Sequence, residues 1–96
     1  MSYTPQAVRN FQNIKKKLPQ SLRDEIDRQV DLICEDPRIG EQKVGDLKWV
    51  WVHKFSLLGQ QYLLAYAFDE STMTLTLLAT GGHENFYRDL KRYLKT

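Results

Sequence analysis

Hydrophobic residues in the first third of the chain recur every three or four positions, which is the spacing of one helix face. A first helix is predicted to start at Thr4-Pro5, with the threonine as N-cap and the proline at the first helical position, and to end at Pro19. A second helix is predicted to start at Pro19-Gln20 or at Ser21, which resembles a capping box together with Asp24, and to end at Asp36-Pro37. The short turn between the two predicts an antiparallel helical hairpin.

The pattern changes after a predicted loop over residues 38–48. From residue 49 to residue 55, two sets of side chains alternate, which is the spacing of a strand. One face has Trp49, Trp51, His53 and Phe55, and the other has Val50, Val52 and Lys54. A nearly apolar run from Gln61 to Phe68 predicts a central strand, and a third strand follows from Thr72 to Thr80. Turns at residues 57–60 and 69–71 are expected to join the three strands into an antiparallel meander.

A last helix is predicted after Gly81-Gly82, because two glycines suit a tight turn out of the third strand. Its apolar residues would dock on the sheet; they are Phe86, Leu90, Tyr93 and Leu94. Met1–Tyr3 could add a short N-terminal strand. The expected fold class is therefore α+β, with the helical hairpin packed on a small antiparallel sheet and a helix at the C-terminus. The length of 96 residues predicts a single domain over residues 1–96.

The net charge is only +2, but the charges are unevenly distributed. Residues 1–17 carry four basic residues and no acidic one, whereas residues 19–37 carry six acidic and two basic residues. Basic residues are again in excess from His83 to the end of the chain. This asymmetry suits a polyanionic partner on one face, and a solvated surface of mixed sign is the alternative.

A single cysteine, Cys34, excludes an intrachain disulfide and a cysteine-based metal site, and its position predicts a small core residue. The spacing of His53 and His83 does not suggest a metal site, and we expect neither a metal nor another cofactor. No apolar run is long enough to span a bilayer and no signal-peptide pattern opens the chain. We therefore expect a cytoplasmic protein with no membrane partner.

The predicted C-terminal helix carries most of the candidate catalytic and binding residues. His83, Tyr87 and Lys91 lie four residues apart on one face, with Arg88 and Arg92 beside them. The start of this helix, with its free backbone N–H groups, favours an anion such as phosphate. Two simpler interpretations stay open. Tyr87 could be an amphipathic residue at the edge of the core, and Arg88 could do no more than form an ion pair with Glu84.

The chain resembles the RelE/ParE superfamily of toxins from bacterial type II toxin–antitoxin systems over nearly its whole length. Four segments carry the resemblance: the helical hairpin ending at Asp36-Pro37, the segment from Gly45 to Phe55, the strand from Gln61 to Tyr66, and the segment from Gly82 to Lys91. The resemblance implies a sheet with two N-terminal helices on one side and a functional concave side. It also implies a cognate antitoxin that wraps and silences the toxin.

Similarity to the RelE branch implies a ribonuclease that cuts messenger RNA, often on the ribosome. Its working residues, carried over by position, fall on Lys54, Gln61, His83 and Tyr87. Two of these depart from the RelE pattern, because Gln61 lies where a strand arginine is expected and His83 replaces an arginine. Similarity to the ParE branch would instead imply inhibition of DNA gyrase by binding alone. The missing strand arginine also leaves an inactive, toxin-derived scaffold open.

Metal-free RNA cleavage needs a group that removes the 2′-OH proton, a group that stabilises the phosphorane charge and a group that protonates the 5′-oxygen. His83 is suited to acid–base chemistry near neutral pH, whereas Tyr87 would need nearby cations to act as a base. We expect Lys54 to take part in catalysis with these two. The residues expected to bind RNA phosphates are Arg88, Lys91, Arg92 and Gln61.

Aromatic residues of the predicted sheet have two possible uses. Tyr62 or Trp51 could stack on unpaired bases of the RNA. Trp49 and Trp51 could instead form a strip that binds the antitoxin, although a place in the core is favoured for both.

Overall fold

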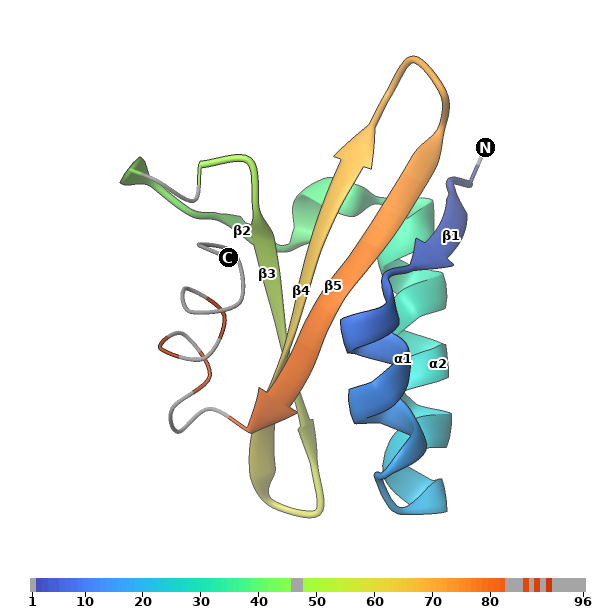
Figure 1. Cartoon of the computed structure of the whole chain (residues 1–96), viewed down its shortest axis with the longest axis vertical. Helices are drawn as coiled ribbons and strands as arrows, with labels where there is room; N and C mark the ends of the chain where they lie inside the picture. The colour runs from blue at the N-terminus through green and yellow to red at the C-terminus, as the bar shows by residue number, and fades with distance from the viewer. Residues whose placement is uncertain (1, 46–47, 83–85, 87, 89, 91–96) are drawn as a thin grey trace.

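The computed structural model describes residues 2–45, 48–82, 86, 88 and 90 of the chain (Figure 1). The chain begins with strand β1, followed by two helices, a short 3₁₀ helix and four further strands. In order, these elements are β1 (Thr4–Ala7), α1 (Arg9–Lys16), α2 (Gln20–Glu35), η1 (Pro37–Ile39), β2 (Glu41–Gln42), β3 (Trp51–Leu57), β4 (Gln60–Asp69) and β5 (Thr74–Gly82). The α+β class predicted from the sequence is confirmed.

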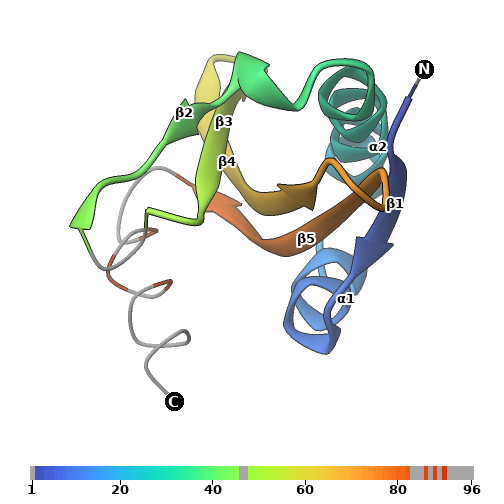
Figure 2. The same cartoon turned by 90° about the horizontal axis from the view of Figure 1, so that it is seen from above.

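The strands form one five-stranded sheet in the order β1-β5-β4-β3-β2. Strands β3, β4 and β5 make the predicted antiparallel meander, with the apolar strand β4 at its centre. Strand β1 pairs in parallel with β5, and β2 pairs only with the first two residues of β3, Trp51 and Val52. Figure 2 shows that the sheet is strongly curved, with α2 inside its bend.

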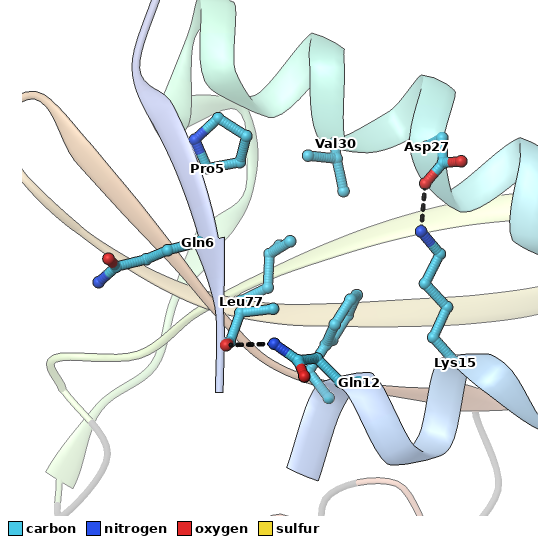
Figure 3. A pocket seen from close by; sticks show the side chains of 9 residues that line it. Pro5, Gln6, Gln12, Lys15, Asp27, Val30 and Leu77 are labelled. Atoms are coloured by element: carbon cyan, nitrogen blue, oxygen red, sulfur yellow. Dashed lines mark hydrogen bonds and ion pairs between the residues drawn. The ribbon is translucent and has the colours of Figure 1, made fainter. Parts of the chain in front are cut away.

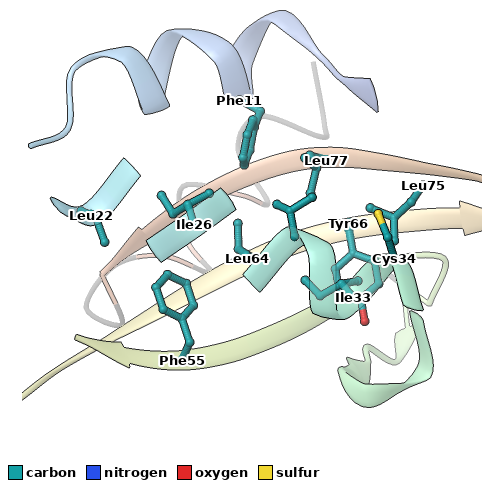
Figure 4. Close-up of a cluster of buried hydrophobic side chains, with 11 residues drawn as sticks. Phe11, Leu22, Ile26, Ile33, Cys34, Phe55, Leu64, Tyr66, Leu75 and Leu77 are labelled. Carbon is teal, nitrogen blue, oxygen red and sulfur yellow. The ribbon is translucent and has the colours of Figure 1, made fainter. Parts of the chain in front are cut away.

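The main core lies between α2 and the sheet (Figure 4). The predicted apolar stripe of α2 is buried here, with Ile26 and Ile33 both fully buried and Cys34 only 5% exposed. Their partners on the sheet include Phe55, Leu64 and Leu77. A second buried cluster lies on the opposite face of the sheet and includes Val50, Val52, Leu63, Phe86 and Leu90. The sheet is therefore covered on both faces, which is why β4 reads as almost continuously apolar.

The predicted start of the first helix is wrong. Thr4-Pro5 belongs to strand β1, and α1 begins only at Arg9, after Val8. The N–H of Thr4 donates to the carbonyl of Met73 (2.8 Å), and this pairing along β5 takes precedence over the local helix signal. A proline is tolerated here because β1 is an edge strand with only one neighbour. The strand expected at Met1–Tyr3 is likewise displaced to residues 4–7.

The capping box expected at Ser21 is also absent. Helix α2 begins at Gln20 with Pro19 as N-cap, and no side chain caps it, so Ser21 lies inside the first turn. The C-terminal boundary at Asp36-Pro37 is confirmed, because α2 ends at Glu35 and η1 begins at Pro37. The Asp36 side chain accepts a hydrogen bond from the N–H of Arg38 (3.2 Å) and so caps η1.

The segment predicted as a loop after Pro37 contains η1 and β2, and Tyr66 of β4 holds it in place. The Tyr66 hydroxyl donates a hydrogen bond to the carbonyl oxygen of Pro37 and accepts one from the N–H of Gly40 (3.2 Å). Gly40 has to be glycine, because a Cβ at this position would collide with the Tyr66 hydroxyl and lie 3.0 Å from the carbonyl oxygen of Val52. Burial raises the pKa of Tyr66 to about 12.

Two further predictions are corrected. Trp49 precedes β3 and is 48% exposed, so it is not a core residue, whereas Trp51 packs on the ring of Phe68 at 5.4 Å. Gly81 and Gly82 are the last residues of β5, not a turn with positive φ. Positive φ occurs instead at Leu58 (52°) and Gly59 (79°), in the predicted turn between β3 and β4.

Candidate active site

The face of the sheet opposite α2 carries two of the predicted site residues. Side chains alternate along β3, so that Phe55 points into the α2 core while Val52 and Lys54 share the other face. The same alternation along β4 places Gln61 on the face of Leu63. We call this surface, defined by Lys54, Ser56 and Gln61, the sheet face.

Lys54 and Gln61 are close neighbours on the sheet face. Lys54 is aligned with Leu63, and Ser56 is aligned with Gln61, in the antiparallel pairing of β3 with β4. Lys54 and Gln61 are therefore diagonal neighbours, a relation that typically separates backbones by about 7–8 Å. Both side chains are exposed, and neither forms a hydrogen bond or ion pair with another residue in the described part of the chain. An ammonium and an amide are thus available to a ligand on this face.

Phe86 and Leu90, beyond β5, pack on the same side of the sheet as Lys54. Phe86 and Leu90 are helical and only 6% and 2% exposed, because they pack in the cluster that contains Val52 and Leu63. Gly81 lies beside the Phe86 ring, and a Cβ at this position would be in ordinary van der Waals contact with it, at 3.6 Å. Arg88, between these two anchors, is exposed. The docking predicted for Phe86 and Leu90 is confirmed.

The remaining predicted site residues lie outside the described residues. They are His83, Tyr87, Lys91 and Arg92, together with Glu84, the predicted ion-pair partner of Arg88. Their roles remain predictions.

The aromatic residues suggested as base-stacking platforms lie on the other face of the sheet. Tyr62 stacks on Phe55 at 5.7 Å, and Trp51 packs against the α2 core beside Phe68. Strand alternation therefore separates both rings from Lys54, so they are not base-stacking residues of the sheet face.

His53 is half-buried on the face of Phe55 and belongs to a polar network that the sequence pattern did not reveal. His53 Nε2 lies 2.7 Å from Gln29 Oε1, and the Gln29 amide donates to Glu25 Oε2 at 2.7 Å. Arg28 donates to the other Glu25 oxygen. Burial lowers the pKa of His53 below its usual value, so the ring is neutral near pH 7. The network connects β3 to α2 across the sheet from Lys54.

A pocket of about 280 Å³ lies on the helix side of the molecule (Figure 3). Phe11, Val30 and Leu77 give it an apolar wall, and an ion pair between Lys15 and Asp27 bridges α1 and α2 at its edge. The Gln12 amide donates to the Ala7 carbonyl (3.1 Å). The lining residues come from β1, β5 and the two helices, so the pocket is separate from the sheet face.

In the part of the chain that the structure describes, no group of three His, Cys, Asp or Glu side chains is arranged to hold a metal ion. None of the helices found there is both long and apolar enough to cross a membrane.

Comparison with known proteins identifies the family. The model for the ParE-like toxin of type II bacterial toxin–antitoxin systems matches residues 6–91. The chain belongs to this family. No curated protein sequence matches it significantly.

Solved structures of toxins share its fold. The free E. coli toxin RelE, as a variant with two arginines replaced by alanine, has a TM-score of 0.76 and 19% identity, covering 98% of this chain and 99% of that chain. A chain of the Mycobacterium tuberculosis RelBE2 toxin–antitoxin complex has a TM-score of 0.70 and 19% identity, covering 86% and 100%. The archaeal RelE–RelB complex from Pyrococcus horikoshii gives 0.62 and 15%, covering 88% and 98%.

These likenesses confirm the RelE-like fold expected from the sequence. The chain is thus a toxin of a type II toxin–antitoxin system with a RelE-like fold. Its sheet face, on the opposite side of the sheet from α2, carries Lys54 and Gln61, and this position guides the assignment of activity.

Proposed function

We propose that this toxin is a metal-independent endoribonuclease that cuts messenger RNA, in the cytoplasm and on the ribosome. The observation that supports this most directly is the pair of exposed polar side chains, Lys54 and Gln61, on the sheet face. The segment anchored on the sheet by Phe86 and Leu90 also carries an exposed arginine, Arg88. A cationic sheet face of this kind suits the backbone of a single-stranded RNA.

In the proposed reaction, the ribose 2′-oxygen attacks the adjacent phosphorus after its proton is removed. A bond forms between the 2′-oxygen and phosphorus, and the bond from phosphorus to the 5′-oxygen breaks. The products are a 2′,3′-cyclic phosphate and a 5′-hydroxyl, once the leaving oxygen has gained a proton. No metal or oxidant is needed for this balance.

The proposed roles follow from the charge that each step creates. His83 and Tyr87 exchange protons with the 2′-oxygen and the 5′-oxygen. Lys54 stabilises the negative charge that develops on the phosphorane oxygens, as a pre-placed cation. The groups that bind the flanking phosphates are Arg88, Lys91, Arg92 and Gln61.

We also propose a cognate antitoxin as the protein partner. Several structural neighbours are complexes of a RelE toxin with a RelB antitoxin. An antitoxin that covers the sheet face would block access to Lys54 and so silence the toxin.

The test is a map of messenger RNA 5′ ends by primer extension after brief induction of the toxin. We expect new ends inside translated frames. The double variant His83→Ala/Tyr87→Ala should abolish them, and Lys54→Gln should slow their appearance roughly 100-fold. Arg9→Gln, which removes an exposed cation from α1, is the matched control and should leave cleavage unchanged. Equal cleavage by all variants would exclude these residues from the chemistry.

Two observations favour a second candidate, a DNA gyrase inhibitor that acts by binding. The matching family model is that of ParE-like toxins, and Gln61 occupies the strand position where a RelE nuclease is expected to carry arginine. Growth arrest with chromosome damage and intact messenger RNA would support this candidate. Absence of both arrest and cleavage would instead identify an inactive scaffold.

A further inference from the structure

The sheet face has a charged part and a neutral part. Lys54 carries the positive charge. Ser56 and Gln61 are aligned with each other in the pairing of β3 with β4, nearer to the turn that joins these strands at the lower end of Figure 1. Side chains aligned in this way have their Cβ atoms about 4.5–5.5 Å apart. A hydroxyl and an amide therefore lie side by side, about 7 Å along β3 from the lysine.

These two polar groups are available to a ligand. Ser56 and Gln61 are both exposed, and no hydrogen bond joins their side chains to another described residue. The neighbouring glutamine differs, because Gln60 Oε1 accepts a hydrogen bond from the Tyr62 hydroxyl at 3.1 Å. Tyr62 packs against the core on the α2 side, so this pair lies on the other face of the sheet. Of the two adjacent glutamines, Gln61 is the one that presents its amide on the sheet face.

The amide of Gln61 suits a nucleobase better than it suits a phosphate. It carries two donors on its nitrogen and an acceptor on its oxygen. A phosphate presents acceptors alone, so it leaves the amide oxygen unused, and a neutral amide gives it no charge-assisted hydrogen bond. The edge of a base, in contrast, can present a donor next to an acceptor.

Adenine matches this amide at two atoms. Its N6 amino group donates and its N7 accepts, and glutamine forms both hydrogen bonds at once. At the corresponding edge guanine presents two acceptors, cytosine one donor and uracil one acceptor, so none of these bases pairs twice with the amide there. The second N–H of the amide stays available for the phosphate contact proposed above.

We propose that Gln61 is a specificity-determining residue, which recognises an adenine base beside the phosphate held by Lys54. This inference rests on the proposed function, since it takes single-stranded RNA as the ligand of the sheet face. The contact is open to such an RNA because its unpaired bases expose their edges. The Ser56 hydroxyl both donates and accepts, so it supports the base without selecting it. The toxin therefore cuts beside adenine more often than beside the other bases.

The test measures the binding of short RNAs that cannot be cut. Hexanucleotides of adenine, cytosine or uracil carry a methyl group on each 2′-oxygen, which blocks attack on phosphorus. Their dissociation constants for the full chain are compared by fluorescence anisotropy. We expect the adenine RNA to bind at least about fivefold more tightly than the other two, the lower end for one base contact with two hydrogen bonds. In Gln61→Glu the preference should pass to cytosine, because a carboxylate accepts from cytosine N4 but has no donor for adenine N7.

Gln60→Glu is the matched control. It introduces the same charge one residue away, on the other face of the sheet, so it should leave the preference for adenine intact. Equal binding of the three RNAs by the unaltered chain would overturn the proposal. An adenine preference that survives in Gln61→Glu, or that is lost to the same extent in Gln60→Glu, would also overturn it.

The map of messenger RNA ends separates this inference from the proposed function. A preference for adenine in binding, without new ends in the map, would refute the ribonuclease and keep the base contact. New ends that lie beside all four bases equally, together with equal binding of the three RNAs, would keep the ribonuclease and refute the role of Gln61.

Discussion

Replacing Tyr66 by phenylalanine should destabilise the toxin through the loss of a single oxygen atom. The Tyr66 side chain is fully buried, and its hydroxyl bonds both to the Pro37 carbonyl and to the Gly40 N–H. Phenylalanine fills the same space but leaves both backbone groups without this partner. A buried polar group that loses its partner costs about 1–3 kcal/mol, so the free energy of unfolding should fall by roughly 3 kcal/mol.

Thermal unfolding followed by circular dichroism measures this loss. For a domain of this size, roughly 3 kcal/mol corresponds to a fall in Tm of about 12–24 °C. Tyr62→Phe is the matched control, because the Tyr62 hydroxyl donates to Gln60 at an exposed site and its loss should change the free energy of unfolding by less than about 0.5 kcal/mol. Equal, small effects of both substitutions would refute the role assigned to the Tyr66 hydroxyl.

Three further predictions concern pH and the hairpin turn. The pKa of Tyr66 is raised from 10.0 to about 12, so the unfolded state loses this proton first. The free energy of unfolding should fall by about 3 kcal/mol between pH 10 and 12 in urea titrations, and Tyr66→Phe should remove this dependence. Burial lowers the pKa of His53, so the free energy of unfolding should fall as the pH drops below 6.5 toward the folded-state pKa. In His53→Asn, the midpoint of urea unfolding should no longer depend on pH over this range. Leu58 has φ of 52° and is 89% exposed, so Leu58→Asn should raise stability by about 1 kcal/mol, seen as a higher Tm. Ser56→Asn, in the adjoining strand, should give no such gain.

Local patterns predicted the elements whose partners are close in sequence. The sequence pattern predicted the apolar stripe of α2 and the end of this helix before Pro37. It also predicted the antiparallel meander of β3, β4 and β5. Strand β1 was not, because Thr4-Pro5 is an equally good helix start and only pairing with β5, 70 residues away, decides the outcome. Likewise, nothing local shows that Gly40 must approach Tyr66.

For the candidate site, the sequence predicted on which face of the sheet Lys54 lies. Alternation along β3 placed His53 with Phe55, and hence Lys54 on the other face. The choice of Tyr62 and Trp51 as base-stacking residues failed because residue type alone does not say which face an aromatic ring occupies. The contact of His53 with Gln29 depends on how α2 crosses the sheet, which no short-range pattern encodes.

The brevity of β2 leaves most of β3 at the border of the sheet. Beyond Trp51 and Val52, no other described strand pairs with the outer side of β3. Such a border can recruit extended segments of other chains, including further copies of the same protein, and an exposed lysine at its middle is a common defence against aggregation. Lys54 lies at this point. Its replacement should therefore be checked for self-association before a loss of toxicity is ascribed to chemistry, and glutamine, which keeps a polar group there, is a safer choice than alanine.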